Sequence, residues 1–200
     1  MAHLPLTLVY RQKFIQDQLN ESAETKKKMF EACTGDILKA VDAMIKAFNN
    51  KKKILLCGNG GSAADAQHIA TELVIRMTKP DRPALAAIAL TTDTSCLTAA
   101  GNDIGFDNVF SRQVEALGSA GDVLIAISTS GKSENVNRAV KQAKKAGMTV
   151  IGFLGKDGGS AKELVDIPII IPSNDTQRIQ EGHITVAHIL CGIIENEMFG

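Results

Sequence analysis

Three of the four histidines in this sequence lie in two segments that could bind a metal ion or transfer protons. His68 and Glu72 are four residues apart, so a helix would place them about one turn apart on the same face. The second segment holds Gln180, His183 and His188, with Glu181 between the first two. Imidazole and carboxylate groups serve both as metal ligands and as acids and bases. An ordinary ion pair on a solvated helix face is the competing interpretation of the first segment.

The second segment leaves the identity of the remaining ligands open. In a regular helix, Gln180 and His188 would be about 12 Å apart along the axis and rotated by about 80°. Gln180 and His183 would be closer, at about 4.5 Å and 60°. Either Gln180 lies at a frayed helix start and leans forward, or some ligands come from another subunit.

Two loops rich in glycine and hydroxyl groups could hold a phosphate. Residues 57–62 read CGNGGS, and residues 128–133 read STSGKS. Glycine lets backbone N–H groups approach an anion, and Ser62 offers both a hydroxyl and a helix cap. The first loop has the glycine spacing of a dinucleotide-binding fingerprint, but Thr78 stands where an acidic residue is expected. The second loop lacks the first glycine of a P-loop, which is Ala126 here. The pair of loops therefore favours a phosphorylated small molecule.

Both loops follow short apolar runs that we expect to be strands. There are five such runs, at residues 54–57, 85–90, 123–127, 149–154 and 167–171. Helical patterns separate them, at residues 62–77, 106–117, 133–146 and 176–198. Apolar runs without alternation are typical of strands covered on both faces, and helices between them provide crossovers between parallel neighbours. The sequence predicts an α/β fold with a doubly wound, five-stranded parallel sheet flanked by helices.

We expect residues 1–50 to form an N-terminal helical pair and residues 51–200 to form the α/β domain, with the two parts making a single structural unit overall. Thr34, Gly35 and Asp36 predict a break between the two N-terminal helices, with Thr34 or Asp36 capping the second. The pair is too short for a core of its own, so it should pack on the sheet or on a neighbouring subunit.

Composition excludes several classes of protein. The 22 basic and 22 acidic residues cancel, and only 4% of residues are aromatic, which argues against a nucleic-acid partner or an anionic membrane surface. No apolar stretch reaches the roughly 20 residues of a membrane span. The four cysteines show no paired spacing, so we expect free thiols and a cytoplasmic protein.

Three motifs together resemble the sugar isomerase (SIS) domain family, and within it the phosphoheptose isomerases. They are GNGGSAADAQH at residues 58–68, AISTSGKS at 126–133 and RIQEGHITVAH at 178–188. The resemblance spans nearly the whole chain and implies the SIS fold, assembled as a homotetramer with active sites at subunit interfaces. It implies an aldose-ketose isomerase that converts sedoheptulose 7-phosphate to D-glycero-D-manno-heptose 7-phosphate through an enediol(ate), for the heptoses of the lipopolysaccharide core.

The resemblance also implies roles for individual residues. It points to one Zn²⁺ per subunit held by His68, Glu72, Gln180 and His188, and it prefers His188 to His183 as a ligand. Glu72 is then the expected base and His188 the expected acid. The residues expected to hold substrate are Asn59, Gly60, Gly61, Ser62, Glu72, Asn102, Asp103, Ser128, Thr129, Ser130, Ser133 and Gln180.

The alternative is a non-catalytic SIS scaffold that binds the replication initiator DnaA. In such relatives, the positions that match Glu72 and His188 hold residues unable to do acid–base chemistry. Both residues are present here, which favours the enzyme.

Overall fold

The fold is built on one parallel sheet of five strands. The computed structural model describes residues 7–200. The strands are β1 (Ile54–Gly58), β2 (Ala87–Ala89), β3 (Val123–Ser128), β4 (Thr149–Gly155) and β5 (Ile167–Ile171). Their order in the sheet is β2-β1-β3-β4-β5, and every neighbouring pair is parallel. The predicted doubly wound, five-stranded parallel sheet is therefore confirmed.

The strand order creates a crevice between β1 and β3. The chain runs from β1 outward to β2, then returns past β1 to β3, so the direction of winding reverses between these two strands. Loops at the carboxyl ends of two such strands diverge toward opposite faces and leave room for a ligand. Gly58 at the end of β1 is in register with Ile127 near the end of β3, so the two glycine-rich loops emerge side by side.

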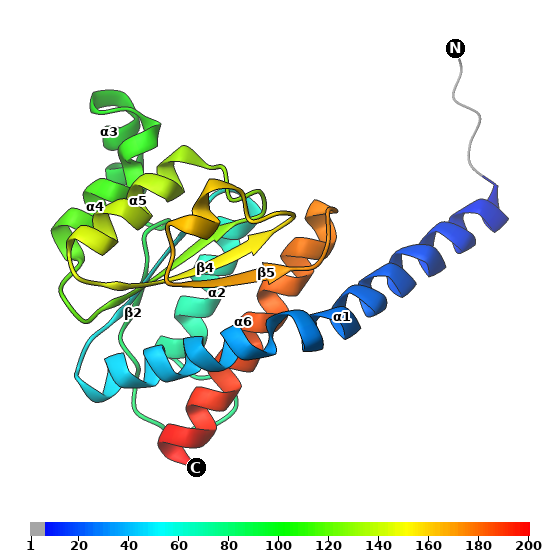
Figure 1. Ribbon diagram of the computed structural model, residues 1–200, viewed down its shortest axis with the longest axis horizontal. Coiled ribbons are helices and arrows are strands. Elements are labelled where there is room, and N and C mark those ends of the chain that lie inside the picture. Colours follow the sequence, from blue (N-terminus) through cyan, green and yellow to red (C-terminus); the bar gives the residue numbers. More distant parts are fainter. Residues whose placement is uncertain (1–6) are drawn as a thin grey trace.

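Helices cover both faces of the sheet, as Figure 1 shows. Alternate residues of β1 point to opposite sides, with Ile54 and Leu56 in one apolar cluster and Leu55 and Cys57 in the other. The first cluster packs under α1 (Leu8–Asn49), α2 (Gly61–Val74) and α6 (Thr176–Phe199). The second packs under α4 (Val109–Leu117) and α5 (Glu134–Lys145), with α3 (Thr94–Asp103) beside them. Two short 3₁₀ helices, η1 (Phe106–Asn108) and η2 (Gly159–Glu163), complete the elements.

The predicted N-terminal helical pair is wrong, because the two halves form one helix, α1 (Leu8–Asn49). Gly35 lies inside it with open space where a Cβ would project, Thr34 donates its hydroxyl back to the Phe30 carbonyl, and Asp36 pairs with Lys39 at 2.8 Å. A glycine inside a helix is destabilising by only about 1 kcal/mol. Burial of the second half of α1 against α6 and β5 exceeds that cost.

The two halves of α1 differ in their surroundings. The buried residues of the helix begin at Thr25 and continue to Phe48, whereas the first half extends away from the body of the molecule (Figure 1). Residues 1–6 of the predicted N-terminal segment lie outside the described residues. The division at residue 50 stays a prediction. In the described part of the chain, no helix has both the length and the apolar character needed to cross a membrane.

Two further expectations need correction near the second strand. The edge strand β2 spans only Ala87–Ala89 of the predicted 85–90, although the Ala86 carbonyl and the Leu90 N–H still bond to β1 at 2.9 and 2.8 Å. Asn102 and Asp103, two of the residues expected to hold substrate, form the end of helix α3, which lies outside the predicted helical segments. Asp93 caps that helix by accepting a hydrogen bond from the backbone N–H of Cys96 at 2.9 Å.

Candidate active site

Two helices bring His68, Glu72 and His188 together. His68 and Glu72 lie one turn apart on α2, with 3.1 Å between His68 Nε2 and Glu72 Oε1. His188 comes from α6, and its Nε2 lies 3.2 Å from His68 Nε2. One ligand atom from each of the three residues lies within 4.8 Å of the others. The predicted pairing of His68 with Glu72 therefore extends to a third residue 120 positions away.

These three groups fit a divalent metal ion. Ligand atoms about 2.0–2.1 Å from a tetrahedral Zn²⁺ are about 3.3 Å from one another. The two separations of 3.1 and 3.2 Å match that spacing. Two imidazoles and one carboxylate also form a donor set that zinc commonly uses. The group is open to solvent on one side, since 45% of the His68 side chain is exposed, so a further ligand or a substrate can approach.

The structure separates the two histidines of α6. His183 is buried, donates from Nε2 to the main-chain carbonyl of Leu154 at 2.9 Å and packs against Phe153. Burial lowers the pKa of His183 to about 4, so its imidazole is neutral at pH 7. His183 therefore packs in the core, and His188 is the histidine that reaches α2.

Gln180 lies at the other end of α2 from Glu72. A Cβ at Gly61 would come within 2.4 Å of Gln180 Nε2, so the carboxamide rests against the first residue of α2. A frayed helix start does not explain its position, because α6 begins at Thr176 and Asp175 caps it at 2.7 Å. Gln180 contacts the start of α2, while His188 contacts its middle.

The two predicted phosphate loops lie next to each other at the switch point of the sheet. Gly60 has a φ of 56°, a conformation that favours glycine, and it directly precedes α2. Asn59 exchanges two hydrogen bonds of 2.9 Å with Asn135 at the start of α5, which ties the first loop to the second. In the second loop, Ser128 Oγ lies 3.2 Å from Ser133 Oγ and accepts the Gly131 N–H at 3.1 Å.

The remaining predicted substrate residues differ in their position. Thr129 and Ser130 are half-buried in the second loop, and Ser62 is buried in the first turn of α2. Asn102 and Asp103 are exposed at the end of α3 and bonded to each other at 2.7 Å. Among the described residues, no hydrogen bond joins Asn102 or Asp103 to either loop.

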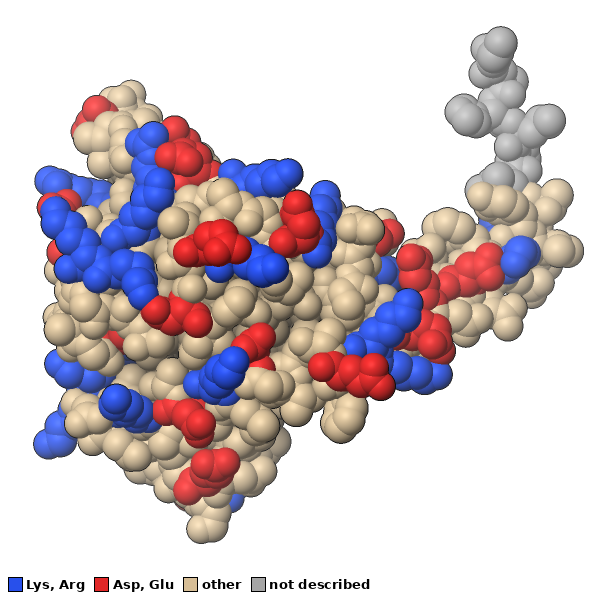
Figure 2. All heavy atoms as spheres, viewed as in Figure 1, with Lys and Arg blue, Asp and Glu red and all other residues tan. Residues whose placement is uncertain are grey.

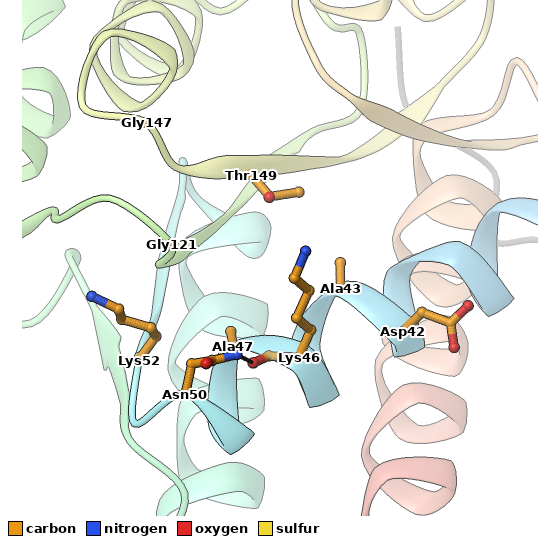
Figure 3. Close-up of a pocket in the computed structure, with 9 residues that line it drawn as sticks. All are labelled: Asp42, Ala43, Lys46, Ala47, Asn50, Lys52, Gly121, Gly147 and Thr149. Carbon is orange, nitrogen blue, oxygen red and sulfur yellow. Dashed lines mark hydrogen bonds between the residues drawn. The ribbon is translucent and has the colours of Figure 1, made fainter.

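A separate cavity lies at the amino ends of the strands. It encloses about 670 Å³ between the end of α1 and the starts of β3 and β4, and Figure 3 shows Lys46 reaching across it toward Thr149. Its lining residues are Asp42, Ala43, Lys46, Ala47, Asn50, Lys52, Gly121, Gly147 and Thr149. None of the predicted site residues belongs to this cavity. The face in Figure 2 carries acidic and basic side chains interspersed, in keeping with the net charge of zero.

Comparison with known proteins assigns the chain to a family. The SIS domain family matches residues 18–155. A phosphoheptose isomerase of Trichlorobacter lovleyi is 55% identical over 189 residues, which cover 94% of this chain and 96% of the relative. The chain belongs to the phosphoheptose isomerase family.

Solved structures of phosphoheptose isomerases share this architecture. That of Neisseria gonorrhoeae is 46% identical, covers 92% of this chain and 98% of its own, and superimposes with a TM-score of 0.87. That of Francisella tularensis is 38% identical, covers 93% and 98%, and has a TM-score of 0.90. The resemblance of the three sequence motifs to phosphoheptose isomerases is thereby confirmed.

In this phosphoheptose isomerase family member, sequence reasoning missed a buried ion pair beside α2. Arg82 Nε lies 2.7 Å from Glu195 Oε1, and both side chains are 1% exposed. Burial alone would raise the pKa of Glu195, but hydrogen bonds from Arg82 and from loop backbone lower it well below its ordinary value. The sequence held one signal of this ion pair, because Glu195 is a charged residue within the otherwise apolar end of α6.

Proposed function

We propose that this chain interconverts sedoheptulose 7-phosphate and D-glycero-D-manno-heptose 7-phosphate, as an aldose-ketose isomerase that supplies heptoses for lipopolysaccharide core synthesis. The observation that carries the proposal is the convergence of Glu72, His68 and His188 in a chain of this family. The presence of Glu72 and His188 disfavours the DnaA-binding scaffold. Four free cysteines support a reducing compartment such as the cytoplasm.

In this proposal, the two glycine-rich loops hold the sugar phosphate. Backbone N–H groups and hydroxyls at the starts of α2 and α5 bind the phosphate and the sugar hydroxyls. The residues assigned to this role are Asn59, Gly60, Gly61, Ser62, Ser128, Thr129, Ser130, Ser133 and Gln180. Asn102 and Asp103 belong to the same set, and they are exposed and, among the described residues, make no hydrogen bond to either loop, which suits a site shared between subunits.

Glu72 and His188 then move the protons. Glu72 takes a proton from C1 of the open-chain ketose and returns it to C2, and the enediol(ate) is the intermediate between the two transfers. His188 donates a proton to the C2 oxygen and recovers one from the C1 hydroxyl, so both residues end in their starting states. Glu72 Oε1 is the oxygen that contacts His68, which leaves Oε2 to face the substrate.

We assign Zn²⁺ to His68, Glu72 and His188, with Gln180 as fourth ligand from the same chain or from a neighbouring copy. A bound Zn²⁺ would polarise the substrate carbonyl and stabilise negative charge on its oxygen.

The same proposal makes the protein a homotetramer. The first half of α1 exposes large apolar residues, among them Phe14, Ile15 and Leu19. Further along, an apolar groove of about 320 Å³ lies between α1 and α6 beside Phe30, which is 76% exposed. An exposed apolar face that long is typical of an interface between subunits. The number four comes from the family resemblance.

An isomerase assay with sedoheptulose 7-phosphate tests the proposal. We expect activity in the purified protein that falls on chelation and returns with Zn²⁺. Glu72→Gln should reduce kcat by about 100-fold or more, the usual contribution of a general base, with the fold intact. Glu115→Gln is the matched control, because Glu115 is an exposed carboxylate on α4 whose ion pair is with Arg112, one turn away on the same helix. Near-normal turnover by Glu72→Gln would contradict the assignment.

A further inference from the structure

The buried Arg82–Glu195 pair joins the loop after α2 to the end of α6. Glu195 accepts hydrogen bonds from the backbone N–H groups of Met77, Thr78 and Lys79 at 2.7, 2.9 and 3.2 Å. The Thr78 hydroxyl adds a bond of 2.8 Å, and Arg82 Nε another of 2.7 Å. The loop therefore wraps around one carboxylate of α6, which accepts hydrogen bonds from three of its backbone N–H groups and two of its side chains.

The same guanidinium also holds the backbone of Glu72. Arg82 Nη2 donates to the main-chain carbonyl of Glu72, and Nη1 donates to that of Pro83 at 2.8 Å. The last carbonyls of a helix lack partners within it, and α2 ends at Val74. Arg82 supplies the missing partner at the residue whose side chain belongs to the candidate site.

Glu195 occupies the same face of α6 as His188. The two residues are seven apart, which is a rotation within about 20° of two full turns and an axial distance of about 10.5 Å. Arg82 thus connects the backbone of Glu72 on α2 to the helix that carries His188. The ion pair and the three site residues lie along one seam between α2 and α6.

We propose that Arg82 and Glu195 are positioning residues that fix α2 against α6 and so set the distance between Glu72 and His188. The inference rests on the proposed function of Glu72 and His188. A positioning role differs from a purely stabilising one in what is lost with the ion pair. Loss of the pair would separate the two helices at the candidate site as well as lower the stability of the fold.

Removing one member of any buried ion pair destabilises a protein, so the test needs a second buried pair remote from the site. Asp122 provides it. Its side chain is 1% exposed, accepts from Lys53 Nζ at 2.6 Å and from the backbone N–H groups of Lys53 and Ser119, and lies just before β3 at the amino ends of the strands. Asp122→Asn therefore matches Glu195→Gln in burial, and each carboxylate accepts from one basic side chain and from backbone N–H groups, two for Asp122 and three for Glu195.

The variants are Arg82→Lys, Glu195→Gln, their double, and Asp122→Asn. Lysine keeps the positive charge but cannot bridge Glu195 and the Glu72 carbonyl at once. We measure Tm, kcat and KM with sedoheptulose 7-phosphate, and Zn²⁺ affinity by competition with a chromophoric chelator. Assays are run well below every Tm, so that all samples are folded.

We expect Arg82→Lys and Glu195→Gln to lower kcat and Zn²⁺ affinity about 10- to 100-fold, the range found when groups that support a metal site are removed. KM should change less than about threefold, because the phosphate loops are left intact. A fall in kcat with little change in KM reflects misplaced reacting groups. The double variant should be no worse than the poorer single variant, since both residues act through one connection. Asp122→Asn should lower Tm while kcat and Zn²⁺ affinity stay within about twofold.

Unchanged kcat and Zn²⁺ affinity in Arg82→Lys and Glu195→Gln would overturn the inference, and so would an equal loss in Asp122→Asn. If either site variant fails to fold, Thr78→Val removes a single donor from Glu195 and should lower kcat at least threefold. Wild-type protein without isomerase activity would refute the proposed function instead, and the Zn²⁺ affinities would still test the positioning role.

Discussion

Replacement of Gly61 by alanine should displace the Gln180 side chain and lower turnover without lowering the stability of the fold. Alanine at Gly61 keeps the backbone N–H of the first loop and adds one methyl group. That methyl would lie 2.4 Å from Gln180 Nε2, whereas nonbonded heavy atoms normally stay about 3.5 Å apart. The carboxamide must therefore move by about 1 Å. A displacement of that size in a reacting or binding group can reduce turnover about 100-fold.

Stability should change little or rise in the same variant. Gly61 is the first residue of α2 and has an ordinary φ, and alanine is favoured over glycine in helices by up to about 1 kcal/mol. Gly35→Ala is the matched control, because Gly35 lies inside α1 with no atom within 4 Å of its added Cβ. That control should gain about 0.5–1 kcal/mol in urea unfolding and keep full activity.

A double-variant cycle decides whether the loss acts through Gln180. Steady-state isomerase assays compare Gly61→Ala, Gln180→Ala and the two combined. We expect the combined variant to match Gln180→Ala, because the methyl has nothing left to displace. Gly61→Ala with kcat within threefold of wild type would refute the reasoning. A combined variant ten times slower than Gln180→Ala would show that the methyl blocks the substrate directly.

Three further outcomes are expected. His183 has a native pKa of about 4, so the unfolded state binds the extra proton below pH 6.5 and the free energy of unfolding should fall by about 3 kcal/mol between pH 6.5 and 4. Urea titrations should show a shallower fall in His183→Gln, and parallel curves would contradict the assignment. Phe30→Glu should shift the protein to smaller assemblies in sedimentation, since a charge would enter an apolar contact. Ellman's reagent should titrate only the half-buried Cys96 in the native chain and all four thiols in denaturant, because the others are buried and burial raises their pKa to about 11 or 12.

The sheet could be predicted from sequence because its strands are covered on both faces. Ile54, Leu56 and their neighbours form unbroken apolar runs whose length and flanking glycines distinguish them from helices. Predictions from local helix propensity were wrong where burial in the folded chain outweighed that propensity. Gly35 should interrupt a helix on propensity alone, yet the apolar positions on either side of it keep one face of α1 against α6.

The candidate site was predictable in part. The proximity of His68 and Glu72 was predictable, because a spacing of four residues in a helix places two side chains on the same face. The choice of His188 over His183 depends on how α6 rotates against α2, a packing property that helical arithmetic does not contain. Arg82 and Glu195 are 113 positions apart, and neither belongs to a motif. Only the folded chain shows that they meet.

The location of His188 and Glu195 on α6 sets the order in which the site is assembled. Both residues are synthesised after all five strands, so a nascent chain contains the complete sheet before it contains either residue. A chain that stops before Thr176 would retain every strand but expose the apolar face that α6 covers, which promotes aggregation. Incomplete synthesis of this protein should therefore yield material for proteolysis rather than a partly active enzyme.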